Sequence, residues 1–188
     1  MVVLRSIFAP CVLVAMLITS PSSWASDFRN ATWGMLFDEV IALHAGELPA
    51  DRRIGYVAFS SILADLEVEI FYRFDADEQL VAAGYVIQAE PERSQMALDD
   101  YGKLNQLLRK RYPQSEEPRQ LFTKQTFAQD PKQWGRALRV GQLSLAWQHE
   151  EPRTQISHTL RGNRRALAHV LEYTAILETS QSDALDQL

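Results

Sequence analysis

The chain has 188 residues, of which 46% are hydrophobic and 23% are charged, and its net charge is −5. This composition is typical of a globular domain, and it excludes a collagen-like chain, a disordered tail and a protein with several membrane spans. The acidic balance argues against nucleic acid or an anionic membrane surface as the partner.

The first 25 residues have the pattern of a signal peptide. Arg5 is the only charged residue before Asp27, and residues 7–18 form an apolar stretch that is short for a membrane span. Ser23-Trp24-Ala25 places small residues at the two positions that a signal peptidase reads. We therefore expect cleavage after Ala25, a periplasmic or secreted protein, and no transmembrane segment after cleavage. An uncleaved anchor is the alternative.

Removing 25 of the 188 residues, with one arginine among them, leaves 163 residues with 18 basic and 24 acidic side chains, a net charge of −6. Cys11 is the only cysteine and lies in the removed segment, so the mature chain has no disulfide, thiolate metal ligand or cysteine nucleophile. We expect a single domain over residues 26–176, which is large enough to fold on its core alone, and a polar tail over 177–188.

The first half of the domain predicts a helix and a three-stranded meander. The expected elements are a helix over 37–44 and strands over 54–60, 64–74 and 81–87. Apolar and polar residues alternate in the last two strands, which is typical of a strand with one buried face. A four-residue loop over 75–78 would pair Tyr72 with Val81 and Val68 with Tyr85, and both apolar sets would then share one face.

The second half repeats this order. The expected elements are helices over 94–111 and from Pro131 to Gly141, and strands over 143–147, 154–160 and 167–173. Asp130 is expected to cap the second helix, and Gly162-Asn163 is typical of a tight hairpin. The segment 114–129 is polar and is predicted to be an irregular linker.

Together these elements predict an α+β fold made of two helix-plus-three-stranded antiparallel meanders in tandem, over about 30–90 and 93–176, with helices covering one face of the sheet. Trp33-Gly34 and Trp134-Gly135 raise the possibility of a duplication. A continuous six-stranded sheet and two packed half-sheets are both compatible with the pattern.

Residues 33–40, Trp-Gly-Met-Leu-Phe-Asp-Glu-Val, resemble a motif of uncharacterised bacterial exported proteins that runs Trp-Gly-x-Ser-x-Glu-Glu-Val. Residues 71–74 with Leu80, Gly84 and Tyr85, and the segment from Trp147 through Ile156, fit the same group. The sequence departs from that pattern at Leu36, where the group has a helix-capping serine, and at Tyr112-Pro113, where a Tyr-Gly turn is usual.

The tandem helix-plus-meander plan is also similar, more remotely, to the β-lactamase-inhibitor-protein and outer-membrane-assembly small-lipoprotein folds. Those similarities imply an exported α+β domain and supply no catalytic residue, because fold does not carry function. Inhibition of an exported enzyme is a further reading that the analogy implies, and an exposed concave sheet rich in aromatic residues would support it.

One candidate binding surface is an acidic stripe on the outward face of a predicted strand. Asp65, Glu67 and Glu69 alternate there, with Phe71 beside them. A solvated sheet face is the simpler interpretation. A docking surface for a basic partner, with Phe71 as an outward aromatic anchor, is the functional one.

Two further groups of residues are candidates. His158 and His169 are expected on one face of adjacent strands, one diagonal apart, where they are either a metal or general-base pair or two buried, hydrogen-bonded histidines. Arg153, Arg161, Arg164 and Arg165 lie at the hairpin ends of the second meander and could hold an anion, or remain in solvent.

The sequence contains no nucleophile elbow, phosphate-binding loop, dinucleotide fingerprint or zinc-protease helix. We therefore assign no catalytic residue, metal or cofactor, and we expect an exported non-enzymatic protein that binds another periplasmic or envelope protein. The alternative is a small exported hydrolase or a metal- or ligand-binding protein that uses His158 or His169.

Overall fold

The computed structural model describes residues 27–176, so the predicted signal peptide and the polar tail lie outside the described residues. The described helices are α1 (Phe37–Ala42), α2 (Ser94–Arg111), α3 (Gln125–Ala128) and α4 (Trp134–Arg139), and 3-10 turns precede α2 (Pro91–Arg93) and α4 (Pro131–Gln133). The strands are β1 (Asp51–Arg53), β2 (Tyr56–Leu63), β3 (Leu66–Phe74), β4 (Leu80–Ile87), β5 (Arg119–Phe122), β6 (Leu143–Glu151), β7 (Thr154–Gly162) and β8 (Leu167–Ala175).

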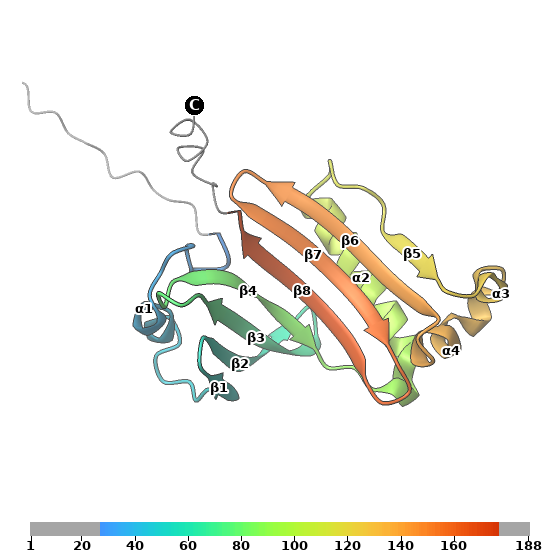
Figure 1. Ribbon diagram of the computed structural model, residues 1–188, viewed down its shortest axis with the longest axis horizontal. Coiled ribbons are helices and arrows are strands. Elements are labelled where there is room, and N and C mark those ends of the chain that lie inside the picture. Colours follow the sequence, from blue (N-terminus) through green and yellow to red (C-terminus); the bar gives the residue numbers. More distant parts are fainter. Residues whose placement is uncertain (1–26, 177–188) are drawn as a thin grey trace, which may run out of the picture.

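All eight described strands form one antiparallel sheet in the order β1-β2-β3-β4-β8-β7-β6-β5 (Figure 1). This arrangement confirms the predicted α+β class and decides for a continuous sheet. The two meanders meet at their last strands, because β4 pairs with β8 from Ala82↔Thr174 to Ile87↔His169.

Each half of the sheet has one strand more than the sequence predicts. In the first half the extra strand is β1, and in the second it is β5, which lies inside the predicted irregular linker and pairs with β6 from Arg119↔Ala146 to Phe122↔Leu143. The prediction of an irregular linker was therefore wrong at β5 and at α3. Both extra strands are short edge strands whose long partner supplies the hydrogen bonds. For β5 that partner is more than 20 residues away, so local sequence does not reveal the strand.

One face of the sheet holds the core. Its side chains form a cluster with α1 around Val40 and Tyr72, and a second cluster with α2 around Val68 and Leu104. Because Val68 and Tyr72 are an even number of residues apart on β3, the two helices pack against the same face. The prediction of helices on one face is confirmed.

The pairing of β3 with β4 differs from the predicted register by two residues. Tyr72 pairs with Ala83, and Val68 pairs with Ile87. The loop is longer by one residue, since Asp75 donates its N–H to the carbonyl of Gln79, and an irregularity between Arg73 and Phe74 shifts the ladder once more. A shift of two preserves the buried face, so the alternation was informative although the pairing was wrong.

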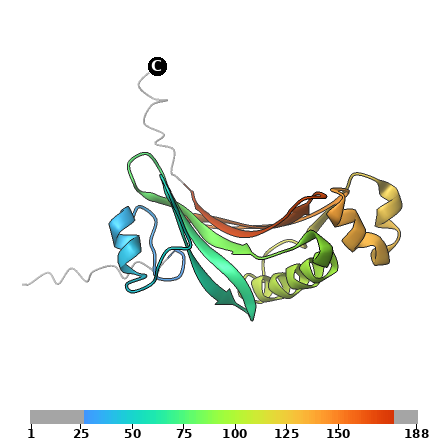
Figure 2. The ribbon, with the colours of Figure 1, turned by 90° about the horizontal axis from the view of Figure 1, so that it is seen from below.

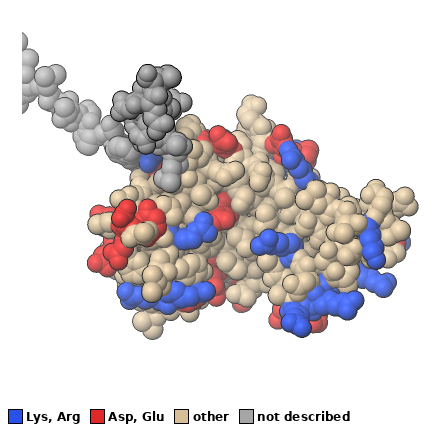
Figure 3. Space-filling model, in the orientation of Figure 1, with Lys and Arg blue, Asp and Glu red and all other residues tan. Residues whose placement is uncertain are grey.

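None of the described helices packs on the opposite face of β6, β7 and β8, and Figure 2 shows this face curved away from α2. Its side chains are small or polar: Ser144, Ala146, Gln148, Ser157, Thr159, Val170 and Glu172. Figure 3 views the molecule from this side, and uncharged surface separates the charged groups there. This face lacks the aromatic residues that an inhibitor surface was expected to show. Over the described residues, no helix is long and apolar enough to cross a membrane.

Candidate functional site

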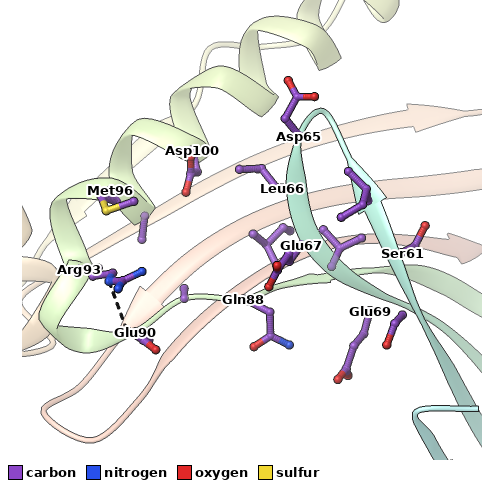
Figure 4. Close-up of a pocket in the computed structure, with 16 residues that line it drawn as sticks. Ser61, Asp65, Leu66, Glu67, Glu69, Gln88, Glu90, Arg93, Met96 and Asp100 are labelled. Carbon is purple, nitrogen blue, oxygen red and sulfur yellow. Dashed lines mark ion pairs between the residues drawn. The ribbon is translucent and has the colours of Figure 1, made fainter.

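A groove with a cavity volume of about 940 Å³ lies between the β2–β3 hairpin and the beginning of α2. It forms because β4 ends at Ile87, opposite Val68, so the first residues of β3 extend past the end of β4. The chain then turns away through Gln88 and Glu90 into α2, whose first turns face the hairpin (Figure 4).

Most of the charged residues that line the groove are acidic. The acidic residues that line it are Asp65, Glu67, Glu69, Glu90 and Asp100, and Arg93 is the one basic residue among the lining side chains. Arg93 is 3.4 Å from the carboxylate of Glu90, and Lys103, from the next turn of α2, is 3.6 Å from Asp65. Among the described residues, neither Glu67 nor Glu69 makes an ion pair.

The pKa of Asp100, the carboxyl group that α2 contributes, is raised. Partial burial raises the pKa of Asp100, and the neighbouring Asp99 raises it further, while Lys103 opposes the change. A carboxyl with a raised pKa is one whose charge is not fully compensated by the protein. A cation placed in this groove would supply the missing compensation.

The structure brings the predicted acidic stripe into this groove, with two corrections. Asp65 does not lie on the strand but in the two-residue turn that joins β2 to β3, where its φ is +67°. Phe71 shares the face of Glu69 but is only 5% exposed, so its expected role as an outward anchor is wrong.

Gly84 explains the burial of Phe71. It lies opposite Phe71 on β4 and has no side chain, and a Cβ at this position would lie 2.9 Å from the Phe71 ring. The Phe71 ring therefore lies over β4 at Gly84. The ring of Tyr56, on β2, is stacked on it with the ring centroids 6.1 Å apart. No local sequence pattern reports this cross-strand cover.

His158 and His169 lie diagonally on adjacent strands, as the sequence predicts. Their Nε2 atoms are 2.9 Å apart, both residues are 0% exposed, and Nδ1 of His158 is 3.2 Å from the side-chain oxygen of Asn105 on α2. Burial lowers the pKa of both imidazoles, and at His158 the neighbouring ring lowers it further.

This geometry favours the structural interpretation of the two histidines. Within residues 27–176, no group of three histidine, cysteine or carboxylate side chains is placed to hold a metal ion. Zinc sites in proteins have at least three protein ligands, and these two rings supply only two. Neither ring lines the groove.

The four candidate arginines do not form one site. Arg153 lies at the beginning of β7, 3.7 Å from the carboxylate of Asp27. Arg161 is near the far end of the same nine-residue strand, and Arg164 and Arg165 follow it in the exposed turn before β8. Opposite ends of a strand of this length are roughly 25 Å apart, so no single anion contacts all four.

A polar cluster around the buried His44 was not predicted from the sequence. Nδ1 of His44 is 3.1 Å from the carboxylate of Glu47, and its Nε2 is 2.9 Å from the hydroxyl of Tyr72. The ring of His44 is stacked on Phe59 at 3.9 Å. The His-x-x-Glu spacing is visible in the sequence, but Tyr72 is 28 residues away, and only the fold places it there.

No protein-family model, curated protein or solved structure matches the chain. The geometry of the groove is therefore the basis of the proposed function.

Proposed function

We propose that the protein is an exported, non-enzymatic binding protein whose acidic groove binds a basic segment of another protein of the cell envelope. The charge of the groove is the observation that carries this proposal, since five carboxylates line it against one guanidinium. The signal-peptide pattern of residues 1–25 supports export.

The charges are arranged to receive a partner. Glu67 is exposed and Glu69 is partly exposed, and over the described residues neither makes an ion pair with a basic side chain, although Arg53 interacts with Glu69 electrostatically. Like charges that are close together repel, and a lysine- or arginine-bearing partner relieves this repulsion while it forms charge-assisted hydrogen bonds.

The shape supports a segment rather than a folded domain as the occupant. The groove holds a volume at the upper end of the range for ligand pockets, and its walls are a narrow hairpin and the first turns of α2. Met96 and Ile62 add exposed apolar surface to the lining, where the stems of lysine or arginine side chains can pack.

A synthetic peptide tests the proposal. The probe is acetyl-Lys-Thr-Lys-Val-Lys-Thr-Lys-amide, called the lysine peptide below, and its affinity for the purified protein is measured by calorimetry. The double variant Glu67→Lys/Glu69→Lys is expected to weaken binding at least about tenfold, because attraction becomes repulsion at two positions.

The matched control is Asp77→Lys/Glu78→Lys. These two residues are exposed in the β3–β4 loop, outside the groove, and the control changes the net charge by the same amount. It is expected to leave the affinity within about twofold, because distant exposed charges are screened. Equal weakening by both variants would show that only net charge matters, and the groove would not be the site.

The hydrolase alternative receives no support from the arrangement of the histidines. A general base must reach the proton that it removes, and both rings are 0% exposed. Burial also lowers the pKa of both groups; Asn105 is at hydrogen-bond distance from His158, and among residues 27–176 no carboxylate is paired to either ring. A binding protein is the function that the geometry supports best.

A further inference from the structure

The free edge of β2 borders the acidic groove. β1 pairs with β2 only at Tyr56, Val57 and Ala58, and among the described strands no other one pairs with the rest of β2 on that side. Over the remaining five residues, Phe59 to Leu63, β2 is therefore an edge strand, and one side of its backbone has no partner among the described strands.

The turn geometry shows which backbone groups point outward. Both β2 hairpins have two-residue turns, so the closing pairs Arg53↔Tyr56 and Leu63↔Leu66 are hydrogen-bonded pairs. The backbone groups of successive residues point to alternate sides of a strand. The carbonyl of Ala58 accepts from the N–H of Ala50, so it points to the β1 side. The N–H and C=O groups of Ser60 and Ile62 consequently point to the same, open side.

This edge lacks the usual protection against strand pairing. Proteins commonly block an edge with a proline, a charged side chain, a bulge or a covering loop. Residues 59–63 contain no proline and no charge, and Ile62 is 65% exposed. By comparison, β5, the edge strand at the other end of the described sheet, begins at Arg119, directly after Pro118.

We propose that the basic partner segment binds in an extended conformation, as an additional strand on Ser60 and Ile62. This inference rests on the proposed function and adds the binding mode. Four unpaired backbone groups give the main-chain hydrogen bonds of such an addition, and side-chain contacts give its specificity.

The positions of the two glutamates fit this mode. Glu69 is the cross-strand neighbour of Ser60, and Glu67 is that of Ile62, on the face that also lines the groove. An added strand would lie two strand spacings, roughly 10 Å, from β3. A lysine or arginine on the added strand can extend over the short Ser60 side chain to Glu69, so a partner with a basic residue at every second position matches the edge.

Two forms of the lysine peptide test the backbone pairing. One is N-methylated at the lysine residues, and the other is N-methylated at the intervening residues. In a strand, only every second N–H faces the neighbour, so strand addition predicts that one form loses at least about fivefold in affinity and the other binds like the parent. Equal affinity of the two forms would overturn the inference.

Ile62→Pro tests the same pairing from the protein. It removes an N–H that points away from β3, so the β2–β3 ladder is preserved, and a thermal melt verifies the fold. The matched control Ile62→Thr shortens the side chain but keeps the N–H. The proline variant is expected to bind the lysine peptide about fivefold more weakly than the threonine variant.

The outcomes separate the two proposals. If Glu67→Lys/Glu69→Lys abolishes binding while both N-methylated forms and both Ile62 variants bind like their parents, the basic segment binds without strand pairing, and this inference falls alone. If the lysine peptide does not bind the unmodified protein, the proposed function and this inference fall together.

Discussion

His158 and His169 face each other through their Nε2 atoms at 2.9 Å in the centre of the sheet, and Tyr101 of α2 is stacked on His158 at 4.2 Å. One imidazole must donate the hydrogen bond and the other must accept it, so the accepting ring must be neutral. A proton added to either ring would place a charge inside the core, and a proton on the accepting nitrogen would also remove the lone pair that the contact needs.

We predict that acid destabilises the protein through this pair. The folded-state pKa of each ring lies below the ordinary value of 6.5, so the unfolded chain binds more protons below that pH. Stability from this source is complete above about pH 6.5 and is lost as the pH falls toward the folded-state pKa. Between pH 7 and pH 5 the loss is about 2 kcal/mol per histidine.

Urea denaturation at pH 7, 6 and 5 measures this loss. The double variant His158→Leu/His169→Leu removes both titrating groups. Its unfolding is expected to take up about two fewer protons at acidic pH, so its free energy of unfolding should depend less on pH, whatever its stability at pH 7. A variant that retains the full pH dependence of the parent would show that other groups cause the acid sensitivity.

The outcome for individual elements shows what the sequence can predict. α2 agrees with its predicted bounds, Ser94–Arg111, because its apolar stripe and its basic last turn are local signals. Asp130 accepts from the N–H of Lys132, as expected of a cap. At Leu36, where a capping serine is absent, the N-cap side chain makes no capping hydrogen bond, while the carboxylate of Glu39 accepts from the Leu36 N–H.

The errors have non-local causes. β5 depends on β6 for its hydrogen bonds, and the burial of Phe71 depends on the missing side chain of Gly84 on another strand. For the candidate site, the alternation in 64–74 predicts Glu67 and Glu69 on one outward strand face, and both residues line the groove in the structure. The wall supplied by α2, with Asp100 and Arg93, requires the tertiary structure.

Gly84→Ala is expected to destabilise the protein strongly. The added Cβ would overlap the carbonyl oxygen of Leu171 and would lie 2.9 Å from both Glu172 Cα and the Phe71 ring. Overpacking between two central strands costs about 1–3 kcal/mol or more, because backbone cannot move away cheaply. Thermal denaturation followed by circular dichroism measures the effect.

The matched control is Gly102→Ala. Gly102 lies inside α2, and a Cβ there meets nothing within 4 Å, so the change is expected to stabilise the protein by about 0.5–1 kcal/mol through helix propensity. If Gly84→Ala were as well tolerated as Gly102→Ala, the close packing of Phe71 over β4 would be incorrect.

Tyr72→Phe is expected to lower stability by about 1–2 kcal/mol. With Nδ1–H of His44 donating to Glu47, Nε2 accepts from the Tyr72 hydroxyl, and burial raises the pKa of Tyr72 to about 12, so this hydroxyl keeps its proton. The substitution leaves a buried nitrogen without a donor. Tyr56→Phe, a half-buried tyrosine, is the control and is expected to change stability by less than about 0.5 kcal/mol.

Binding of the lysine peptide is expected to depend steeply on salt. Glu67 is exposed and Glu69 partly exposed, so dissolved ions screen their attraction for lysine, and the screening length falls from about 10 Å at 0.1 M salt to about 3 Å at 1 M. We expect the affinity to fall at least about tenfold over this range, mainly through a slower association rate. Stopped-flow kinetics at several NaCl concentrations separates the two rates. Glu67→Gln/Glu69→Gln should remove most of the salt dependence, and a salt-independent affinity in the unmodified protein would instead assign the binding to apolar contacts.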